Sequence, residues 1–293
     1  MLSPMRAFCA VTLFATTGLT TPALAADGTV LQPGDTLAIT GEAAAVISPV
    51  VLGNAPMVVA QTSVPAGTVD TTDEEIIPAS GFELSGNVAL VSDYRFRGVS
   101  FSDGDIALQG GLDLGHSSGF YIGTWASSIS GGTAFGELEL DVYGGYSADI
   151  TDGVTIDVGL LYYIYPTGDV VGAETDYFEP YASIGTTLGP VSATLGAAYA
   201  WEQDSLGGDD NIYVYTDFET AIPDTPVTLS AHVGYTDGIF ATQGDGTSFD
   251  WGLGASYAVT ESLSLGVNYV DTQGPSIEDL TDAGFFVTLG YSM

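Results

Sequence analysis

The sequence predicts an all-β protein, a single transmembrane antiparallel up-and-down β-barrel of about 12 strands. Three features predict this class. Apolar residues alternate with polar or small ones, which is the period of a strand with one apolar face. Short and long connections alternate along the chain, as they do in outer-membrane barrels. Aromatic residues lie near the ends of the apolar faces, where membrane barrels carry their aromatic girdles.

Composition excludes several other classes of protein. The 293 residues include 37 Asp and Glu but only 3 Lys and Arg, so the formal net charge is −34. A chain this acidic cannot bind nucleic acid through phosphate contacts. The aromatic fraction of 11% argues against a wholly disordered chain. A single cysteine, Cys9, excludes a disulfide framework and a thiolate metal site.

Residues 1–25 are predicted to be a cleaved signal peptide. Arg6 precedes an apolar run over 7–19, and Ala23-Leu24-Ala25 has the small residues of a cleavage site. The alternative is an N-terminal membrane anchor. Cleavage would leave Arg95 and Arg97 as the only basic residues of an exported protein.

Residues 26–81 are predicted to form a flexible periplasmic extension. The segment is rich in Ala, Val, Thr, Pro and Gly and contains no aromatic residue. Its uncharged stretch, 43–60, resembles a transmembrane helix in hydropathy. Pro49, Gly53 and Pro56 interrupt that stretch, and each is unfavourable inside a helix.

Residues 82–293 contain the predicted barrel. In 154–165 the even positions are apolar, whereas the odd positions begin with Thr155, Asp157 and Gly159. The stretches with this alternation are 84–98, 105–115, 119–128, 136–149, 154–165, 176–188, 191–202, 210–222, 227–237, 247–259, 262–272 and 283–293.

The connections predict how the barrel is oriented. Those after even-numbered stretches are short, and most of those after odd-numbered stretches are longer and rich in Gly and Asp. Short periplasmic turns and long extracellular loops are typical of outer-membrane barrels. An even strand number then predicts that the N- and C-termini are both periplasmic. Since lipid tolerates no open sheet edge, the strands are expected to close.

The faces of the strands distinguish this barrel from a soluble sandwich, which also alternates. The inward faces are small and acidic, with Gly111, Gly145, Gly159, Gly185 and Gly254 among them. The outward aromatic residues are predicted to be Tyr94, Phe96, Tyr146, Tyr199, Trp201, Phe218, Tyr257, Tyr269, Phe285 and Tyr291. The last stretch alternates up to Met293, as expected of a strand that the barrel-assembly machinery reads, although a terminal aromatic residue is more usual there.

Several of these segments resemble the TorF-type outer-membrane porins of Gram-negative bacteria. The opening stretch, GNVALVSDYRFRGVS at 86–100, resembles the first strand of that family. The segments QGGLD at 109–113, SGFYIGTWAS at 118–127 and ELDVYGGY at 139–146 fit its following strands. The resemblance covers about 83–293. It implies an outer-membrane barrel with a pore, and it implies no particular substrate.

Alternation also assigns the residues that face the lumen. On the first stretch, Val88, Leu90, Tyr94 and Phe96 are predicted to face lipid, and the residues between them to face inward. The predicted pore-lining residues are Asp93, Arg95, Arg97, Asp113, Glu137, Glu139, Asp141, Asp157, Glu179, Asp217, Glu219, His232 and Asp250, and Glu202 is also placed inward. Carboxylates around a wet constriction favour cations. The alternative is an internal salt-bridge network that closes the lumen.

The predicted function is therefore an outer-membrane diffusion channel for small solutes or ions, biased toward cations. The alternative is a closed structural or adhesive barrel whose extracellular loops bind a partner. Neither catalysis nor a cofactor is predicted. Ser230 and His232 share a face, but residues two apart on a strand are about 7 Å apart, which is too far for direct hydrogen bonding. Acidic loops at 207–211 and 244–246 suggest calcium binding but match no calcium motif.

Overall fold

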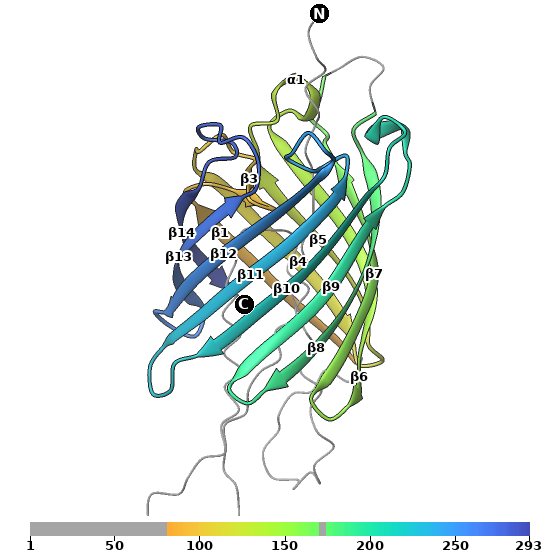
Figure 1. Ribbon diagram of the computed structural model, residues 1–293. Coiled ribbons are helices and arrows are strands. Elements are labelled where there is room, and N and C mark those ends of the chain that lie inside the picture. Colours follow the sequence, from red (N-terminus) through yellow and green to blue (C-terminus); the bar gives the residue numbers. More distant parts are fainter. Residues whose placement is uncertain (1–80, 170–173) are drawn as a thin grey trace, which may run out of the picture.

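The computed structural model describes residues 81–169 and 174–293, which form a closed β-barrel (Figure 1). The predicted signal peptide and all but the last residue of the predicted extension lie outside the described residues. Within the described ranges, no helix has the length and hydropathy needed to cross a membrane.

Twelve antiparallel strands form the wall, which confirms the predicted fold class. Hydrogen bonding between the first and last of these strands closes the barrel, with Leu90 opposite Leu289. Apart from the end of the first strand, the observed limits lie within two residues of the predicted ones. In chain order the wall consists of β1 (Phe82–Val91), β4 (Ala107–His116), β5 (Phe120–Ser128), β6 (Leu138–Thr151), β7 (Val154–Ile164), β8 (Tyr177–Leu188), β9 (Val191–Ala200), β10 (Asn211–Ala221), β11 (Val227–Gly238), β12 (Thr247–Ala258), β13 (Leu263–Thr272) and β14 (Gly284–Ser292).

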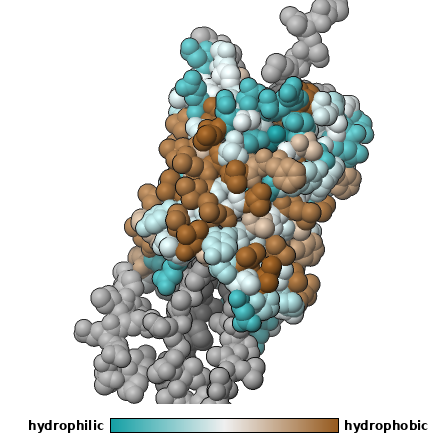
Figure 2. Space-filling view, turned by 90° about the vertical axis from the view of Figure 1, so that its left-hand side faces the viewer, coloured by the Kyte–Doolittle hydropathy of each residue, from teal (hydrophilic) through white to brown (hydrophobic). Residues whose placement is uncertain are grey.

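The outer surface of the wall is apolar. Along β12, Leu253 and Tyr257 are 61% and 51% exposed, whereas Asp250 is 3% exposed. Figure 2 shows hydrophobic side chains over the middle of the wall and hydrophilic ones toward its ends. The predicted outward aromatics that are exposed are Tyr199, Trp201, Phe218, Tyr257, Phe285 and Tyr291, and Tyr146 and Tyr269 are half-buried.

The two rims of the barrel differ in the length of their connections. One rim carries only short turns, the longest being 222–226 between β10 and β11. The opposite rim carries longer connections, which include α1 (Gly132–Phe135) and the 3₁₀ helix η1 (Asp204–Leu206). Figure 1 shows α1 on the rim opposite the β10–β11 turn. The connection after β1, residues 92–106, also starts from the long-loop rim.

This first connection corrects one prediction. The first strand ends at Val91, not at 98, and the following residues form a hairpin of β2 (Arg95–Phe96) and β3 (Val99–Ser100). Tyr94 and Phe96, predicted to face lipid, are 2% and 1% exposed and pack inside the barrel. The alternation of apolar and polar residues over 84–98 predicts one long strand, but these residues include a reversal of the chain.

The reversal occurs at Arg97 and Gly98, whose φ angles are +47° and +79°. Two successive positive φ angles make a type I′ turn, which suits the twist of a tight hairpin. Gly98 fits this geometry, but arginine rarely adopts a positive φ. The turn therefore places the Arg97 side chain at the tip of a segment that lies inside the barrel.

Candidate functional site

The interior of the barrel holds most of the charged residues predicted to face inward. The buried ones on the wall strands are Asp113, Glu139, Asp141, Asp157, Glu179, Asp217, His232 and Asp250. Glu219 on β10 is half-buried. Two acids lie elsewhere: Glu137 is exposed in the connection before β6, and Glu202 is exposed beyond the end of β9. Both positions follow the alternation, but they lie outside the strands that make the wall.

The connection 92–106, which contains the hairpin of β2 and β3, carries Asp93, Arg95 and Arg97 into the interior. Arg95 Nε donates to Asp93, and its Nη1 donates to the Asp282 carbonyl oxygen at 2.7 Å. Ser100 Oγ donates to Asp93 Oδ1 at 2.5 Å. These contacts bind the hairpin to itself and to the connection between β13 and β14.

The tip of the hairpin reaches the opposite part of the wall. Arg97 Nη2 lies 3.2 Å from Glu179 Oε1 on β8, and both side chains are almost fully buried. The Arg97 guanidinium carbon lies 3.8 Å from the ring centroid of Tyr213 on β10. Arg97 therefore has both a carboxylate partner and an aromatic face.

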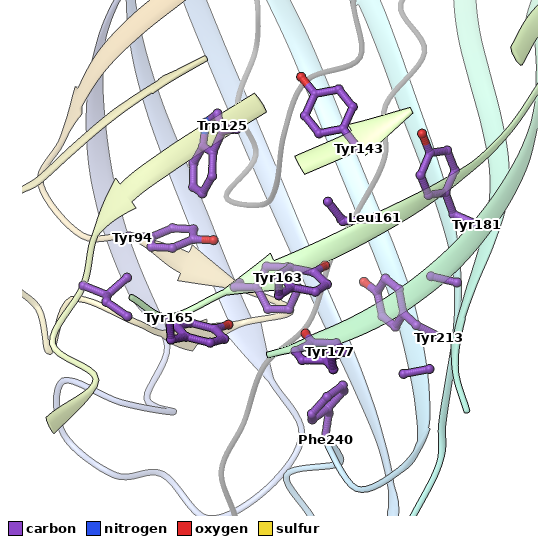
Figure 3. Close-up of a cluster of buried hydrophobic side chains, with 14 of the residues drawn as sticks. Tyr94, Trp125, Tyr143, Leu161, Tyr163, Tyr165, Tyr177, Tyr181, Tyr213 and Phe240 are labelled. Carbon is purple, nitrogen blue, oxygen red and sulfur yellow. The ribbon is translucent and has the colours of Figure 1, made fainter. Parts of the chain in front are cut away.

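Tyrosine rings, which the predicted set of inward residues does not include, line the interior beside these acids. Figure 3 shows Tyr94, Tyr143, Tyr163, Tyr165, Tyr177, Tyr181 and Tyr213 converging on the interior. Tyr94 and Tyr165 hydroxyls each donate to Glu139, at 2.8 Å. Tyr163 Oη donates to Glu179 Oε2 at 3.3 Å. The odd positions of 154–165 continue as Leu161, Tyr163 and Tyr165, so an inward aromatic face was readable in the sequence.

Two more carboxylates are held by tyrosine hydroxyls toward the short-turn rim. Tyr121 Oη donates to Asp157 Oδ1 at 2.8 Å, and Tyr143 Oη donates to Asp113 Oδ1. Asp141 differs from them. It is fully buried, and neither of its carboxylate oxygens has a hydrogen-bond partner within the part of the chain that the structure describes.

His232 joins three strands in a separate network. Its Nδ1 lies 2.5 Å from Asp217 on β10, and its Nε2 lies 2.9 Å from Asp250 on β12. Tyr213 Oη lies 2.8 Å from the same Nε2. Two carboxylate partners suit an imidazolium, which donates from both nitrogens. Ser230 Oγ has no hydrogen-bond partner within the part of the chain that the structure describes, so it is not hydrogen-bonded to His232 as a Ser–His hydrolase pair requires.

Some of the inward glycines lie under tyrosine rings of neighbouring strands. Gly145 pairs with Tyr121, and Gly159 pairs with Tyr181. A Cβ atom at either glycine would overlap the hydroxyl end of its tyrosine partner. These glycines therefore make room for rings rather than for open lumen.

No metal centre is evident over 81–169 and 174–293, where no group of three or more His, Cys, Asp or Glu side chains is placed to hold an ion. The loop at 244–246 contains a local hydrogen-bonded turn. Asp245 Oδ1 accepts hydrogen bonds from the Thr247 backbone N–H and hydroxyl, at 3.1 and 3.2 Å. The interior of the barrel is thus the candidate site.

Comparison with known proteins places the chain in a sequence family. The model of the family described as "Bacterial protein of unknown function (Gcw_chp)" matches residues 75–290. No curated protein matches the chain. Solved structures of similar architecture include the NanC porin, with 14% identity, a TM-score of 0.49, and coverage of 72% of this chain and 99% of that one.

Two further solved structures are similar to the chain at a comparable level. The KdgM porin in complex with disordered oligogalacturonate has 10% identity and a TM-score of 0.48, covering 72% of this chain and 98% of that one. An outer membrane channel from Pseudomonas putida F1 has 15% identity and a TM-score of 0.41, covering 77% of this chain and 99% of that one.

Proposed function

We propose that this chain, which belongs to the bacterial family Gcw_chp, is an outer-membrane diffusion channel for small solutes with a preference for cations. The outer membrane would be its location, with both termini on the periplasmic side. The resemblance of 86–100 and the following strands to TorF-type porins supports the same function. The C-terminal strand would be read by the barrel-assembly machinery.

The observation that carries the proposal is the contrast between the two surfaces of one closed wall. Outside, residues such as Leu253 and Val287 are 61% and 55% exposed. Inside, carboxylates such as Asp141 and Glu179 are at most 1% exposed. Lipid requires every strand edge to be paired, and charged side chains in a membrane protein face the interior or water. A closed barrel with this polarity suits a bilayer.

The charge of the interior supports a preference for cations. The carboxylates of the inward faces outnumber the interior basic residues Arg95, Arg97 and His232. Carboxylates around a polar path attract cations and repel anions, and the low-dielectric wall strengthens the effect.

One observation favours the alternative, a closed structural or adhesive barrel whose loops bind a partner. Arg97 and Tyr163 are 4% and 1% exposed, so the level of the hairpin tip is closely packed. In a channel of this design, ions would pass through the space beside the hairpin or through a path that opens when the hairpin moves. A closed barrel would retain the hairpin as a permanent plug.

Swelling of proteoliposomes distinguishes these functions. The full chain is reconstituted and challenged with isosmotic solutes of similar size that are cationic, neutral or anionic. We expect swelling to be fastest with the cationic solute and slowest with the anionic one. Folded protein that produces no swelling with any solute would favour the closed barrel, and fastest swelling with the anion would contradict the cation preference.

A further inference from the structure

We propose that the interior contains a binding site for solutes with a guanidinium or ammonium group, and that Arg97 occupies this site as a built-in ligand. The site consists of the Glu179 carboxylate and the face of Tyr213. It deepens the proposed channel function, because it names the chemical class of solute that the lumen would hold.

The contacts of Arg97 define the chemistry of the site. A guanidinium carbon 3.8 Å from the centroid of Tyr213 is within cation–π range. The same group lies 3.2 Å from Glu179 Oε1 and 3.4 Å from Oε2. A carboxylate and an electron-rich ring around one buried volume select a cation and exclude a phosphate or carboxylate solute.

The wall holds both components of the site in place without help from the hairpin. Tyr163 Oη donates to Glu179, and Tyr163 is stacked on Tyr177 with ring centroids 4.4 Å apart. Tyr213 Oη lies 2.8 Å from His232 Nε2 and 3.1 Å from Asp250 Oδ1. Because strands β7, β8 and β10 to β12 fix these groups, the site would persist when Arg97 is removed. Such preorganisation lowers the cost of binding a replacement.

Arg97 itself is attached to a segment that differs from the wall. It stands at the first central position of a type I′ turn with φ at +47°, where Asn, Asp or Gly is usual. The backbone conformation does not favour arginine at this position, so the contacts of the Arg97 side chain explain why an arginine occurs here. A solute cation that displaces the guanidinium would release the hairpin tip from β8 and β10. The same site could thus couple solute binding to the width of the lumen.

The proposal is tested on the full chain in detergent micelles, by offering free guanidinium to a variant that lacks the Arg97 side chain. Arg97→Ala vacates the site, and the probe is guanidinium chloride at millimolar concentration. Ligands that bind the folded state raise the midpoint of thermal unfolding. We expect guanidinium to raise this midpoint for Arg97→Ala by several degrees more than for the wild type. Urea, the neutral analogue, should give no such difference.

Two further variants provide controls. Arg95→Ala removes the other interior guanidinium, whose partners are Asp93, Asp282 and backbone carbonyls rather than an aromatic face, and should show no specific response. Arg97→Ala with Glu179→Gln should lose the response. An equal response of Arg97→Ala and the wild type, or an equal effect of urea, would overturn the proposal.

The outcome does not depend on whether Arg97→Ala folds readily. If it folds only when guanidinium is present during refolding, that rescue supports the site. If it folds under neither condition, Arg97→Gln, whose neutral side chain is shorter, undergoes the same measurement, and no guanidinium response from it would contradict the proposal. Binding in micelles requires no conduction, so a failed site and a failed channel give different results.

Discussion

At the scale of residues, tyrosine rings on the inner surface of the barrel pack over glycines of neighbouring strands. Tyr181 lies over Gly159, and Tyr215 lies over Gly196, each on the neighbouring strand. Glycine inside a strand costs about 0.5–1 kcal/mol relative to alanine. Contact with an aromatic ring offsets that cost and fixes the register between strands. The Tyr181 hydroxyl in turn lies 2.6 Å from the Tyr121 hydroxyl, which donates to Asp157.

This pairing predicts opposite behaviour for two inward glycines. Gly159→Ala should destabilise the barrel by about 1–3 kcal/mol, because the new methyl group would overlap the Tyr181 hydroxyl. Gly185→Ala is the matched control on the adjacent strand, since its Cβ would meet only Thr194 Oγ1 at 3.7 Å. It should be neutral or stabilising by up to about 1 kcal/mol. Urea unfolding in detergent measures both, and equal losses would contradict the packing argument.

At the scale of elements, the hairpin of β2 and β3 occupies part of the barrel interior. Gly98 packs so closely on β13 that a Cβ would lie 2.6 Å from Thr272 Cβ and 2.9 Å from the Asp271 carbonyl oxygen. Alternation along 84–98 could not reveal this element, because apolar and polar residues continue to alternate across the chain reversal. The signal that could have revealed it is Arg97-Gly98, where glycine suits a tight turn.

Gly98→Ala should therefore move the hairpin tip away from β13. We expect a loss of stability of about 1–3 kcal/mol from the close contact and an increase in single-channel conductance. The control is Gly208→Ala, whose φ of +81° is also positive but whose Cβ would meet nothing within 4 Å. Strain of about 1 kcal/mol without a change in conductance is expected there. The hairpin would not limit conduction if Gly98→Ala conducted like the wild type.

At the scale of the whole molecule, the sequence predicts the wall much better than the interior. Period-two alternation and turn residues act over a few neighbours, so they locate the wall strands of 82–293 to within about two residues. Contacts such as Arg97 with Glu179 join residues 82 positions apart. Local patterns assign each of them an inward face but cannot show that they meet, nor that tyrosines fill the space between them.

The whole molecule also brings the opposing charges to one place. The hairpin carries two arginines into an interior whose walls carry carboxylates, and the Arg97–Glu179 ion pair joins the hairpin to the wall. If the proposed channel is correct, this pair would hold the hairpin less firmly than it would in a plugged barrel. The proposed channel and the plugged barrel can therefore be distinguished by measuring conductance.

The decisive measurement is single-channel recording of the refolded full chain in a planar bilayer with a salt gradient across it. We expect discrete conductance steps and a reversal potential whose sign shows preference for cations, because carboxylates outnumber basic residues in the interior. Anion preference would contradict the role of the interior acids. A folded barrel that never conducts would contradict the channel itself and leave the hairpin as a permanent plug.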